Sequence, residues 1–296
     1  MNTGTLGPQQ SYSERATRVW LDLCGNNEET IHFFDDIPDV FNALIEKKIT
    51  VGIVPIENSI EGSVGVTLDL LMEKNVTIIA GIVVPIRHCL ISKGKPEEIQ
   101  IILSHPHALA QCRQFLKENF PNAELRTTGS TSHAARLATE FNEMAAIASE
   151  AAAKTYGLNI LLSGIQDWDK NETRFIVMVS SQNKQQLCIP QEITSNTKTS
   201  IIIYLDSDRP GALYEILREF ATRNINLTRI ESRPSKKSLG DYLFYIDLEG
   251  TIEDTNIREA IQQIKLKTMN LKMLGSYGEY LVEKDNGRGD SNENVR

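Results

Sequence analysis

Cysteine is scarce in this sequence of 296 residues, and the few cysteines present are widely separated. They form no Cys-x-x-Cys pair, and no histidine lies at the spacing of a shared metal site. The pattern therefore disfavours a zinc or dithiol motif and favours buried, reduced thiols over disulfides. The cysteines are Cys24, Cys89, Cys112 and Cys188.

Long apolar runs are also absent, since the longest one, residues 76–86, is too short to span a bilayer and contains Gly81 and Pro85. The start of the chain shows no basic segment followed by an apolar one, so no secretion signal is expected. A basic excess is lacking too, because the net charge is −8, which argues against nucleic acid or an anionic membrane as a partner. We expect a cytoplasmic protein that binds any anionic ligand through local donors.

The hydrophobic content, 41%, is that of a globular protein, and the length allows two domains. Up to about residue 182, short β-branched runs alternate with amphipathic segments, which predicts an α/β domain with largely parallel sheets. The expected strands are 51–56, 76–84, 99–104, 145–149 and 174–179, and the expected helices lie near 12–24, 64–74, 106–118, 132–141 and 149–156. Ligands of such folds bind where strand carboxyl ends meet helix N-termini.

A change of pattern follows this domain. Residues 183–198 are polar and break the alternation, so we interpret them as a linker. Residues 199–283 then show the order strand, helix, strand, strand, helix, strand, which predicts a ferredoxin-like βαββαβ domain. The polar tail, 284–296, is expected to be disordered.

Two polar motifs lie in the first third of the chain. In residues 6–16, Ser11 followed by Glu14 is a capping-box pattern that predicts the start of a helix. In residues 54–71, a buried strand leads into Glu57, Asn58 and Ser59, and polar groups at a strand end suit ligand recognition. An ordinary cap and an ordinary turn would give the same patterns.

Two more motifs follow. Ser104 ends a predicted strand, and Gln111 lies beside the apolar face of the next helix, where it would reach a cleft or solvent. His105 and His107 point apart on a helix, which disfavours a metal site. In residues 164–178, Asp167, Asp169 and Asn171 crowd a turn before a buried strand. The strand begins with a hydroxyl donor beside a cation, Thr173-Arg174, which suits an anionic ligand unless the turn is only structural.

In this order and spacing, the segments resemble the prephenate dehydratase family. The matching motifs are GP-x-x-S-Y-S-E-x-A, PIENSIEGSV-x-x-T-x-D-L, SHP-x-A-L-A-Q-C, STS-x-AA, AAIAS-x-x-AA-x-x-YGL and D-x-x-x-N-x-TRF. After the linker, GAL at 211–213 and ESRP at 231–234 resemble an ACT domain. Together the resemblance covers about residues 5–283.

The resemblance implies that residues 1–182 form two α/β lobes, similar to a type II periplasmic binding protein, with prephenate between them. Carried over by position, Thr173 is the expected catalytic residue, and its hydroxyl would assist loss of the ring hydroxyl without a metal or organic cofactor. The positions expected to bind substrate are Asn58, Ser59, Ser104, Gln111, Ser11, Thr131 and Arg174.

The ACT resemblance implies feedback inhibition by phenylalanine, bound where copies of the domain pair in a homodimer or homotetramer. The expected effector positions are Gly211, Ala212, Leu213, Glu231, Ser232, Arg233 and Pro234.

One departure from the family pattern is Gln10, which stands where the family usually has glycine, so the first loop is expected to have altered backbone geometry. Two alternatives to a prephenate dehydratase remain open at this point. The first is an enzyme that prefers arogenate, which carries an amino group where prephenate carries a keto group. The second is a non-catalytic amino-acid sensor with the same two domains. The intact N-x-TRF run at 171–175 favours an enzyme over a sensor.

Overall fold

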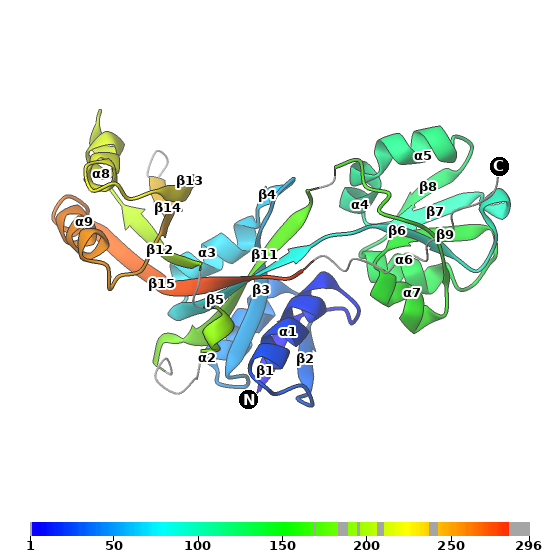
Figure 1. Cartoon of the computed structure of the whole chain (residues 1–296), viewed down its shortest axis with the longest axis horizontal. Helices are drawn as coiled ribbons and strands as arrows, with labels where there is room; N and C mark the ends of the chain where they lie inside the picture. Colours follow the sequence, from blue (N-terminus) through cyan, green and yellow to red (C-terminus); the bar gives the residue numbers. More distant parts are fainter. Residues whose placement is uncertain are drawn as a thin grey trace.

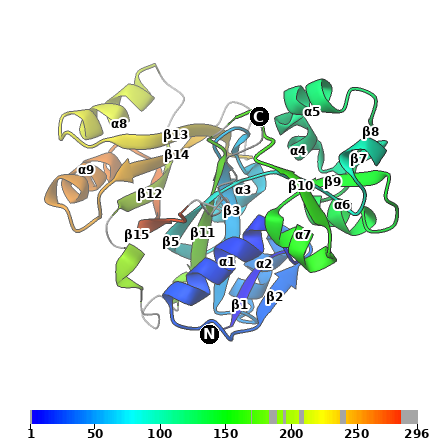
Figure 2. The same cartoon turned by 45° about the vertical axis from the view of Figure 1, so that its right-hand side comes forward.

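The computed structural model describes residues 2–168, 170–182, 189–193, 196–205, 210–236 and 242–283. Within these ranges the chain forms two α/β lobes and a C-terminal domain, seen from two directions in Figures 1 and 2. Asp169, the predicted tail 284–296, and residues 183–188 and 194–195 of the predicted linker lie outside the described residues.

Lobe I is built on strands paired in the order β5-β11-β3-β1-β2. Its sheet is covered by α1 on one face, through Trp20 and Leu21, and by α2 and α3 on the other, through Phe41 and Leu68. The strands are β1 (Thr3–Leu6), β2 (Ile31–Phe34), β3 (Val51–Asn58), β4 (Gly62–Ser63), β5 (Val76–Pro85) and β11 (Glu172–Ser180). The helices are α1 (Tyr12–Leu23), α2 (Ile37–Ile45) and α3 (Gly65–Glu73).

Lobe II has its own five-stranded sheet in the order β10-β6-β9-β7-β8, with helices packed on both faces. The chain enters it after β5 and leaves it before β11, so two crossing segments join the lobes. The strands are β6 (Cys89–Ser92), β7 (Ile101–Ser104), β8 (Glu124–Thr127), β9 (Met144–Ala148) and β10 (Asn159–Ser163). The helices are η1 (Pro96–Glu98), α4 (Pro106–Gln111), α5 (Arg113–Asn119), α6 (Thr131–Leu137) and α7 (Glu150–Tyr156).

The C-terminal domain follows a short turn, η3 (Gln191–Ile193), whose Ile193 is buried against lobe I. Its strands pair in the order β13-β14-β12-β15, as in a ferredoxin-like βαββαβ unit. The elements are β12 (Thr197–Tyr204), α8 (Ala212–Ala221), β13 (Leu227–Pro234), β14 (Tyr242–Glu249), α9 (Thr255–Lys265) and β15 (Asn270–Leu281).

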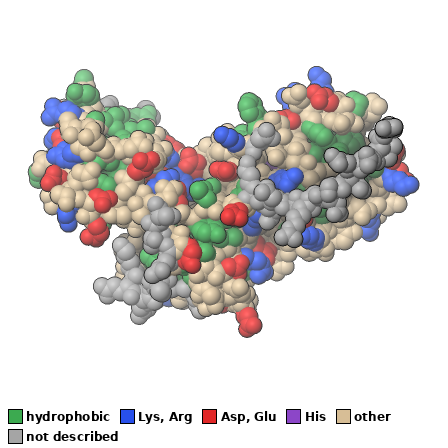
Figure 3. Space-filling model, in the orientation of Figure 1, with side chains coloured by type: hydrophobic (Ala, Val, Ile, Leu, Met, Phe, Trp, Pro, Cys, Tyr) green, Lys and Arg blue, Asp and Glu red, His purple; other side chains and the backbone are tan. Residues whose placement is uncertain are grey.

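The sheets of lobe I and the C-terminal domain are one continuous sheet, because β15 pairs in parallel with β5 from Gly278↔Ala80 to Leu281↔Val83. The face of this sheet that is free of α8 and α9 packs Tyr245 and Tyr277 into the same core as α3. A fully buried large apolar side chain contributes about 1.5–3 kcal/mol, so this shared core fixes the domain against lobe I. The space-filling view shows a broad hollow between the C-terminal domain and lobe II (Figure 3).

The predicted fold class, two α/β lobes followed by βαββαβ, is confirmed. Three details differ. The sheets are mixed and not largely parallel, because β11 returns from lobe II antiparallel to both β3 and β5. The helix predicted over 106–118 is interrupted at Cys112. The strands β1 and β2 were not predicted, since four-residue strands carry little periodic signal, and the nine-residue helix α2 was also missed.

Candidate active site

The ends of β3 and β11 bring the second and fourth motifs together. Thr173 pairs with Asn58 in this antiparallel ladder, and Arg174 pairs with Glu57. Because side chains alternate along a strand, Thr173 and Asn58 share one face while Arg174 and Glu57 share the other. The local pairing therefore separates two residues that the sequence places side by side.

The Asn58 carboxamide has a defined orientation. Its Oδ1 accepts the backbone N–H groups of Ile60 at 2.9 Å and Glu61 at 3.0 Å, and a backbone N–H can only donate. The Nδ2 group therefore points the other way, where it donates to Asn171 Oδ1 at 2.8 Å and to Thr173 Oγ1 at 3.0 Å. Asn58 thus holds the Thr173 oxygen as an acceptor.

The Thr173 hydroxyl consequently keeps its own hydrogen available. Within the described part of the chain, Oγ1 accepts from Asn58 and makes no hydrogen bond as a donor. The side chain is half-buried, so it is accessible to a ligand at the junction of the lobes. This geometry suits donation of a hydrogen bond to a bound oxygen.

Lobe II contributes Gln111 to the same cluster from the end of α4. Its Nε2 donates to Glu61 at 2.9 Å, so its Oε1 is the acceptor, receiving Asn171 Nδ2 at 2.8 Å and His88 Nε2 at 2.7 Å. Only 9% of Gln111 is exposed. We name Asn58, Glu61, His88, Gln111, Asn171 and Thr173 the junction cluster, because its hydrogen bonds connect lobe I, lobe II and a crossing segment.

His88 is neutral in this arrangement. Burial lowers the pKa of its imidazole, although the hydrogen bond with Gln111 opposes the change. Since Gln111 Oε1 is an acceptor, the proton lies on Nε2, which leaves Nδ1 unprotonated. Nδ1 is buried and has no hydrogen-bond partner among the residues that the structure describes.

Ser59 stabilises the turn beside the cluster. Its hydroxyl donates to the Lys170 carbonyl at 3.0 Å and accepts the Glu172 N–H at 2.9 Å. These bonds connect the β3 loop to the start of β11. The structure therefore gives Ser59 a supporting position next to Asn58 and Thr173.

Three other predicted binding residues lie outside the hydrogen-bonded cluster. Ser104 is fully buried and donates to the Ile147 carbonyl at 2.7 Å. Thr131 is the first residue of α6, behind the N-cap Ser130. Ser11 is the N-cap of α1 and accepts from Glu14 N at 3.3 Å, in agreement with the predicted cap.

The first loop contacts both lobes despite its unusual residue. Gln10 has φ 65°, the left-handed backbone that glycine reaches without strain. Its N–H is held by the Glu14 carboxylate at 2.6 Å, and its carbonyl accepts the hydroxyl of Ser149, from lobe II, at 3.4 Å. Gln10 thus adopts a conformation that costs about 1 kcal/mol or more, offset by these contacts.

Arg174 lies away from the junction cluster. Its guanidinium donates to Glu57 at 2.6 Å, to Asp247 at 2.9 Å and to Glu279 at 3.4 Å. Only 7% of the residue is exposed, and two of its three partners belong to the C-terminal domain. Arg174, a predicted substrate ligand, is therefore already engaged in buried ion pairs in this structure.

The motifs predicted to bind an effector lie on α8 and β13. Gly211 is the N-cap of α8 at φ 85°, and Ala212 and Leu213 form the first turn. Along β13 the side chains alternate, so Ser232 and Pro234 are exposed. On the opposite face, Glu231 and Arg233 point to lobe I.

The two inward side chains of β13 contact the catalytic half directly. Glu231 accepts the hydroxyl of Ser63, which belongs to the hairpin that carries Asn58 and Glu61. Arg233 donates to Asp69 of α3 through Nε at 3.1 Å and Nη2 at 2.9 Å. Through Glu231, the second predicted effector motif therefore contacts the β3–β4 hairpin, which we name the active-site hairpin.

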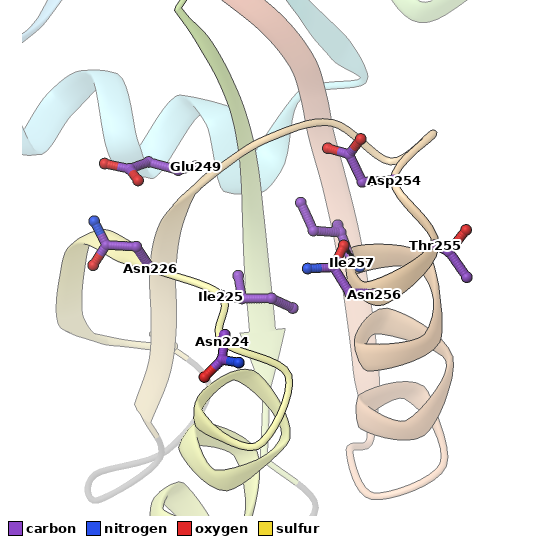
Figure 4. A pocket seen from close by; sticks show the side chains of 8 residues that line it. All are labelled: Asn224, Ile225, Asn226, Glu249, Asp254, Thr255, Asn256 and Ile257. Carbon is purple, nitrogen blue, oxygen red and sulfur yellow. Dashed lines mark hydrogen bonds between the residues drawn. The ribbon is translucent and has the colours of Figure 1, made fainter.

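A separate hollow of about 530 Å³ lies at one end of the C-terminal domain (Figure 4). It lies between the turn after α8 and the start of α9 and contains none of the motif residues. Its lining is mainly amides and carboxylates: Asn224, Ile225, Asn226, Glu249, Asp254, Thr255, Asn256 and Ile257. It belongs to neither of the sites described above.

Glu61, His88 and Asn171 were not among the predicted site residues. Glu61 and Asn171 lie inside quoted motifs, whereas His88 is in a crossing segment that no motif marks. Over the described ranges, no group of three or more His, Cys, Asp or Glu side chains is arranged to hold a metal ion. No helix in those ranges is long and apolar enough to cross a membrane.

Comparisons with known proteins follow the same division of the chain. The family model of prephenate dehydratase matches residues 3–183, and the ACT domain model matches residues 199–266. A prephenate dehydratase of Methanocaldococcus jannaschii is 41% identical, covering 91% of this chain and 95% of its own. A bifunctional chorismate mutase/prephenate dehydratase of Aquifex aeolicus is 40% identical, covering 94% and 74%.

A solved structure gives the same result in three dimensions. The prephenate dehydratase of Arthrobacter aurescens in complex with L-Phe superposes with a TM-score of 0.81 at 34% identity, covering 93% of this chain and 89% of that one. The chain belongs to the prephenate dehydratase family and carries a C-terminal ACT domain.

Proposed function

We propose that this chain catalyses the decarboxylating dehydration of prephenate to phenylpyruvate, with Thr173 as the catalytic residue. The observation that carries the proposal is the Asn58 amide donating to Thr173 Oγ1, which leaves the threonine hydrogen free for a substrate oxygen. The name shared by the relatives supports the same reaction.

The chemistry needs little from the protein beyond positioning and one donor. Breaking the bond to the ring carboxylate releases CO2 and sends its electron pair into the ring. The C–O bond then breaks, and the departing hydroxyl takes up a proton from solvent and leaves as water, so that the ring becomes aromatic. Threonine is too weak an acid to ionise at neutral pH, but its hydrogen bond strengthens as charge develops on the departing oxygen. No metal or organic cofactor takes part in this scheme.

The other members of the junction cluster position the substrate and the donor. Gln111 and Glu61 connect the lobes, so closure of the lobes on a ligand would order Asn58 and Thr173 together. Ser59 supports the same loop. Ser11, Ser104 and Thr131 are proposed ligands for the substrate carboxylates in a closed form, supported by their places at strand or helix ends.

The experiment that tests the activity is an assay with prephenate and arogenate in parallel. We expect prephenate to yield phenylpyruvate, which is detected by its absorbance in alkali, and arogenate to react more slowly. Faster turnover of arogenate would assign the amino substrate. If neither substrate were turned over, the chain would be better explained as a non-catalytic amino-acid sensor.

We propose further that phenylalanine is the feedback inhibitor and binds at the ACT domain. The named relative solved with L-Phe supports this ligand. At the start of α8, the first N–H groups after Gly211 have no acceptor within the helix and are suited to a carboxylate, and the exposed Ser232 and Pro234 lie on β13. Since Glu231 and Arg233 contact lobe I, a ligand that shifts β13 also shifts the active-site hairpin.

A homodimer or homotetramer is the proposed assembly. β13 is one edge strand of the continuous sheet, and Ile230 on β13 and Tyr242 on the neighbouring β14 are exposed. An open edge with apolar neighbours favours pairing with a second copy. The cytoplasm is the proposed compartment, supported by Cys24, Cys89 and Cys112, which are free thiols and form no disulfide among the described residues.

Ser63→Ala is expected to weaken inhibition while phenylalanine still binds. The substitution removes the hydroxyl that Glu231 accepts, and a hydrogen bond to a charged group contributes about 1.5–3 kcal/mol. The phenylalanine concentration for half-inhibition should therefore rise roughly 10-fold. Calorimetry measures binding, activity measures inhibition, and light scattering on the same samples gives the assembly.

Ser276→Ala is the matched control, since Ser276 bonds to Thr199 inside the ACT domain. It should leave inhibition unchanged. Equal loss of inhibition in both variants would show that general loosening is the cause. Unchanged inhibition in Ser63→Ala would remove the Glu231–Ser63 contact from the pathway, and absence of heat with phenylalanine in the parent protein would remove the effector itself.

A further inference from the structure

On the opposite face of the sheet from Thr173, six charged side chains form one cluster, which we name the ionic cluster, and four of them are buried. Each comes from a different strand, and among the described residues three are cations and three are carboxylates. They are Glu57 (β3), Arg174 (β11), Lys198 (β12), Arg229 (β13), Asp247 (β14) and Glu279 (β15).

Arg174 is the member that joins the catalytic half to the ACT domain. It contacts Glu57, Asp247 and Glu279, while Lys198 holds Glu279 at 2.8 Å and Arg229 holds Asp247 at 3.1 Å. The Asp247 and Glu279 side chains are 1% and 4% exposed. Burial would raise the pKa of Asp247, but Arg229 and Arg174 outweigh it and lower that pKa, so the carboxylate stays charged.

A glycine makes the long reach from β15 to β11 possible. β5 lies between these strands, and its Gly81 pairs with Ile176 on one side and Glu279 on the other. A Cβ at Gly81 would come within 2.8 Å of Glu279 Cγ. Glu279 therefore crosses β5 over a position that must lack a side chain.

The contact lies where the ladder between β3 and β11 is irregular. Thr173 and Arg174 pair with Asn58 and Glu57, but Phe175 pairs with Pro55, so β3 has one extra residue there. A bulge interrupts pairing and redirects nearby side chains. On its β3 side, the start of β11 is thus held less firmly by backbone hydrogen bonds than in a regular ladder, whereas its pairing with β5 is regular there.

Stability by itself is a poor reason for so many buried charges. Desolvation of buried ions offsets most of their attraction, and apolar residues of similar volume often serve stability equally well. Charged partners do specify one geometry, because the planar Arg174 guanidinium donates hydrogen bonds to three carboxylates in few orientations. The ionic cluster is therefore better suited to fix a position than to add stability.

We propose that Arg174 is a positioning residue for the dehydratase reaction, held by Asp247 and Glu279, so that the ACT domain sets the pose of Thr173 even without an effector. This inference rests on the catalytic role proposed for Thr173. The ACT domain would then support turnover in the absence of effector, in addition to regulating it.

Three substitutions in the full chain test the proposal from different sides. Glu279→Gln and Asp247→Asn remove one anchor each, and Gly81→Ala displaces Glu279 without changing any charge. We expect kcat to fall roughly 10-fold or more in each, with a smaller change in KM, because small misplacement of a reacting group can cost up to about 10²-fold. Arg174→Lys, which keeps the charge, should retain more kcat than Arg174→Gln.

Glu219→Gln is the matched control. Glu219 is a buried ACT carboxylate paired with Arg223 and Lys267 of its own domain, so its loss should lower the melting temperature and leave kcat unchanged. If kcat of the folded fraction were normal in Glu279→Gln and Gly81→Ala, the positioning role would be overturned. It would also be overturned if kcat fell equally in Glu219→Gln. Thr173→Val, assayed alongside, tests the catalytic role separately, since full activity there would refute that role whatever the anchors do.

Discussion

Replacing Thr173 with alanine is expected to lower kcat roughly 10²-fold or more, with a smaller change in KM. In the proposed mechanism the Thr173 hydroxyl donates a hydrogen bond to the oxygen that leaves, and that bond would gain most of its strength only as the C–O bond breaks. The substrate carboxylates are expected to bind through other groups, so KM should depend less on this donor. Steady-state kinetics with prephenate measures both constants.

Two variants at the same position separate the hydroxyl from the shape of the side chain. Thr173→Val keeps the branched volume but has no donor, and it should match alanine. Thr173→Ser keeps the donor, and it should stay close to the parent protein. Equal activity of the valine and serine variants would mean that the hydroxyl has no part in turnover.

Three of the predicted site residues lie together in the structure because each is close to the end of a secondary-structure element. Asn58 and Thr173 lie at the neighbouring ends of β3 and β11, and Gln111 ends α4. Adjacent strand ends bring such residues together whatever the details of the lobes. The cluster of Asn58, Thr173 and Gln111 therefore follows from the motif positions together with the fold class.

The place of Arg174 also follows from strand geometry, although the motif suggests otherwise. Adjacent residues in a strand face opposite sides, so Thr173 and Arg174 cannot both point to one ligand. The same alternation in β13 separates Glu231 and Arg233 from Ser232 and Pro234. The residues of a contiguous motif on a strand are thus divided between the two faces of the sheet, and only every second residue faces a given ligand.

Other features depend on contacts between distant parts of the chain. His88 joins the site only because a crossing segment passes Gln111, and the sequence near it has no polar pattern. The pairing of β15 with β5, which makes one sheet of two domains, brings together residues far apart in sequence. Periodicity describes single elements, so it gives no information about such pairings.

The two faces of the continuous sheet separate the residues of the candidate site from the residues that contact the ACT domain. One face of the β3–β11 ladder carries Asn58 and Thr173, and the other carries Glu57 and Arg174 with their ACT partners. If Thr173 has the proposed catalytic role, a change in the ACT sheet would reach it through Arg174, its neighbour on β11. The Ser63–Glu231 contact adds a second connection to the same hairpin.

Asn58→Asp is expected to abolish most turnover while the loop around it remains folded. Aspartate still accepts the N–H groups of Ile60 and Glu61, so the turn keeps its hydrogen bonds. It cannot donate to Thr173, however, and its carboxylate would instead accept the threonine hydrogen. The hydroxyl is then directed away from the substrate, and the new charge repels an anionic ligand.

The expected result is a fall in kcat of about 10²–10³-fold, comparable with removal of the Thr173 hydroxyl, together with a rise in KM from the added charge. Asn119→Asp, on the exposed end of α5, introduces the same charge in lobe II and should leave both constants unchanged. The double variant Asn58→Asp with Thr173→Val should be little worse than either single variant, because both remove the same donor. Additive losses would show that Asn58 and Thr173 act independently, and the hydrogen bond between them would then have no role in presenting the proton.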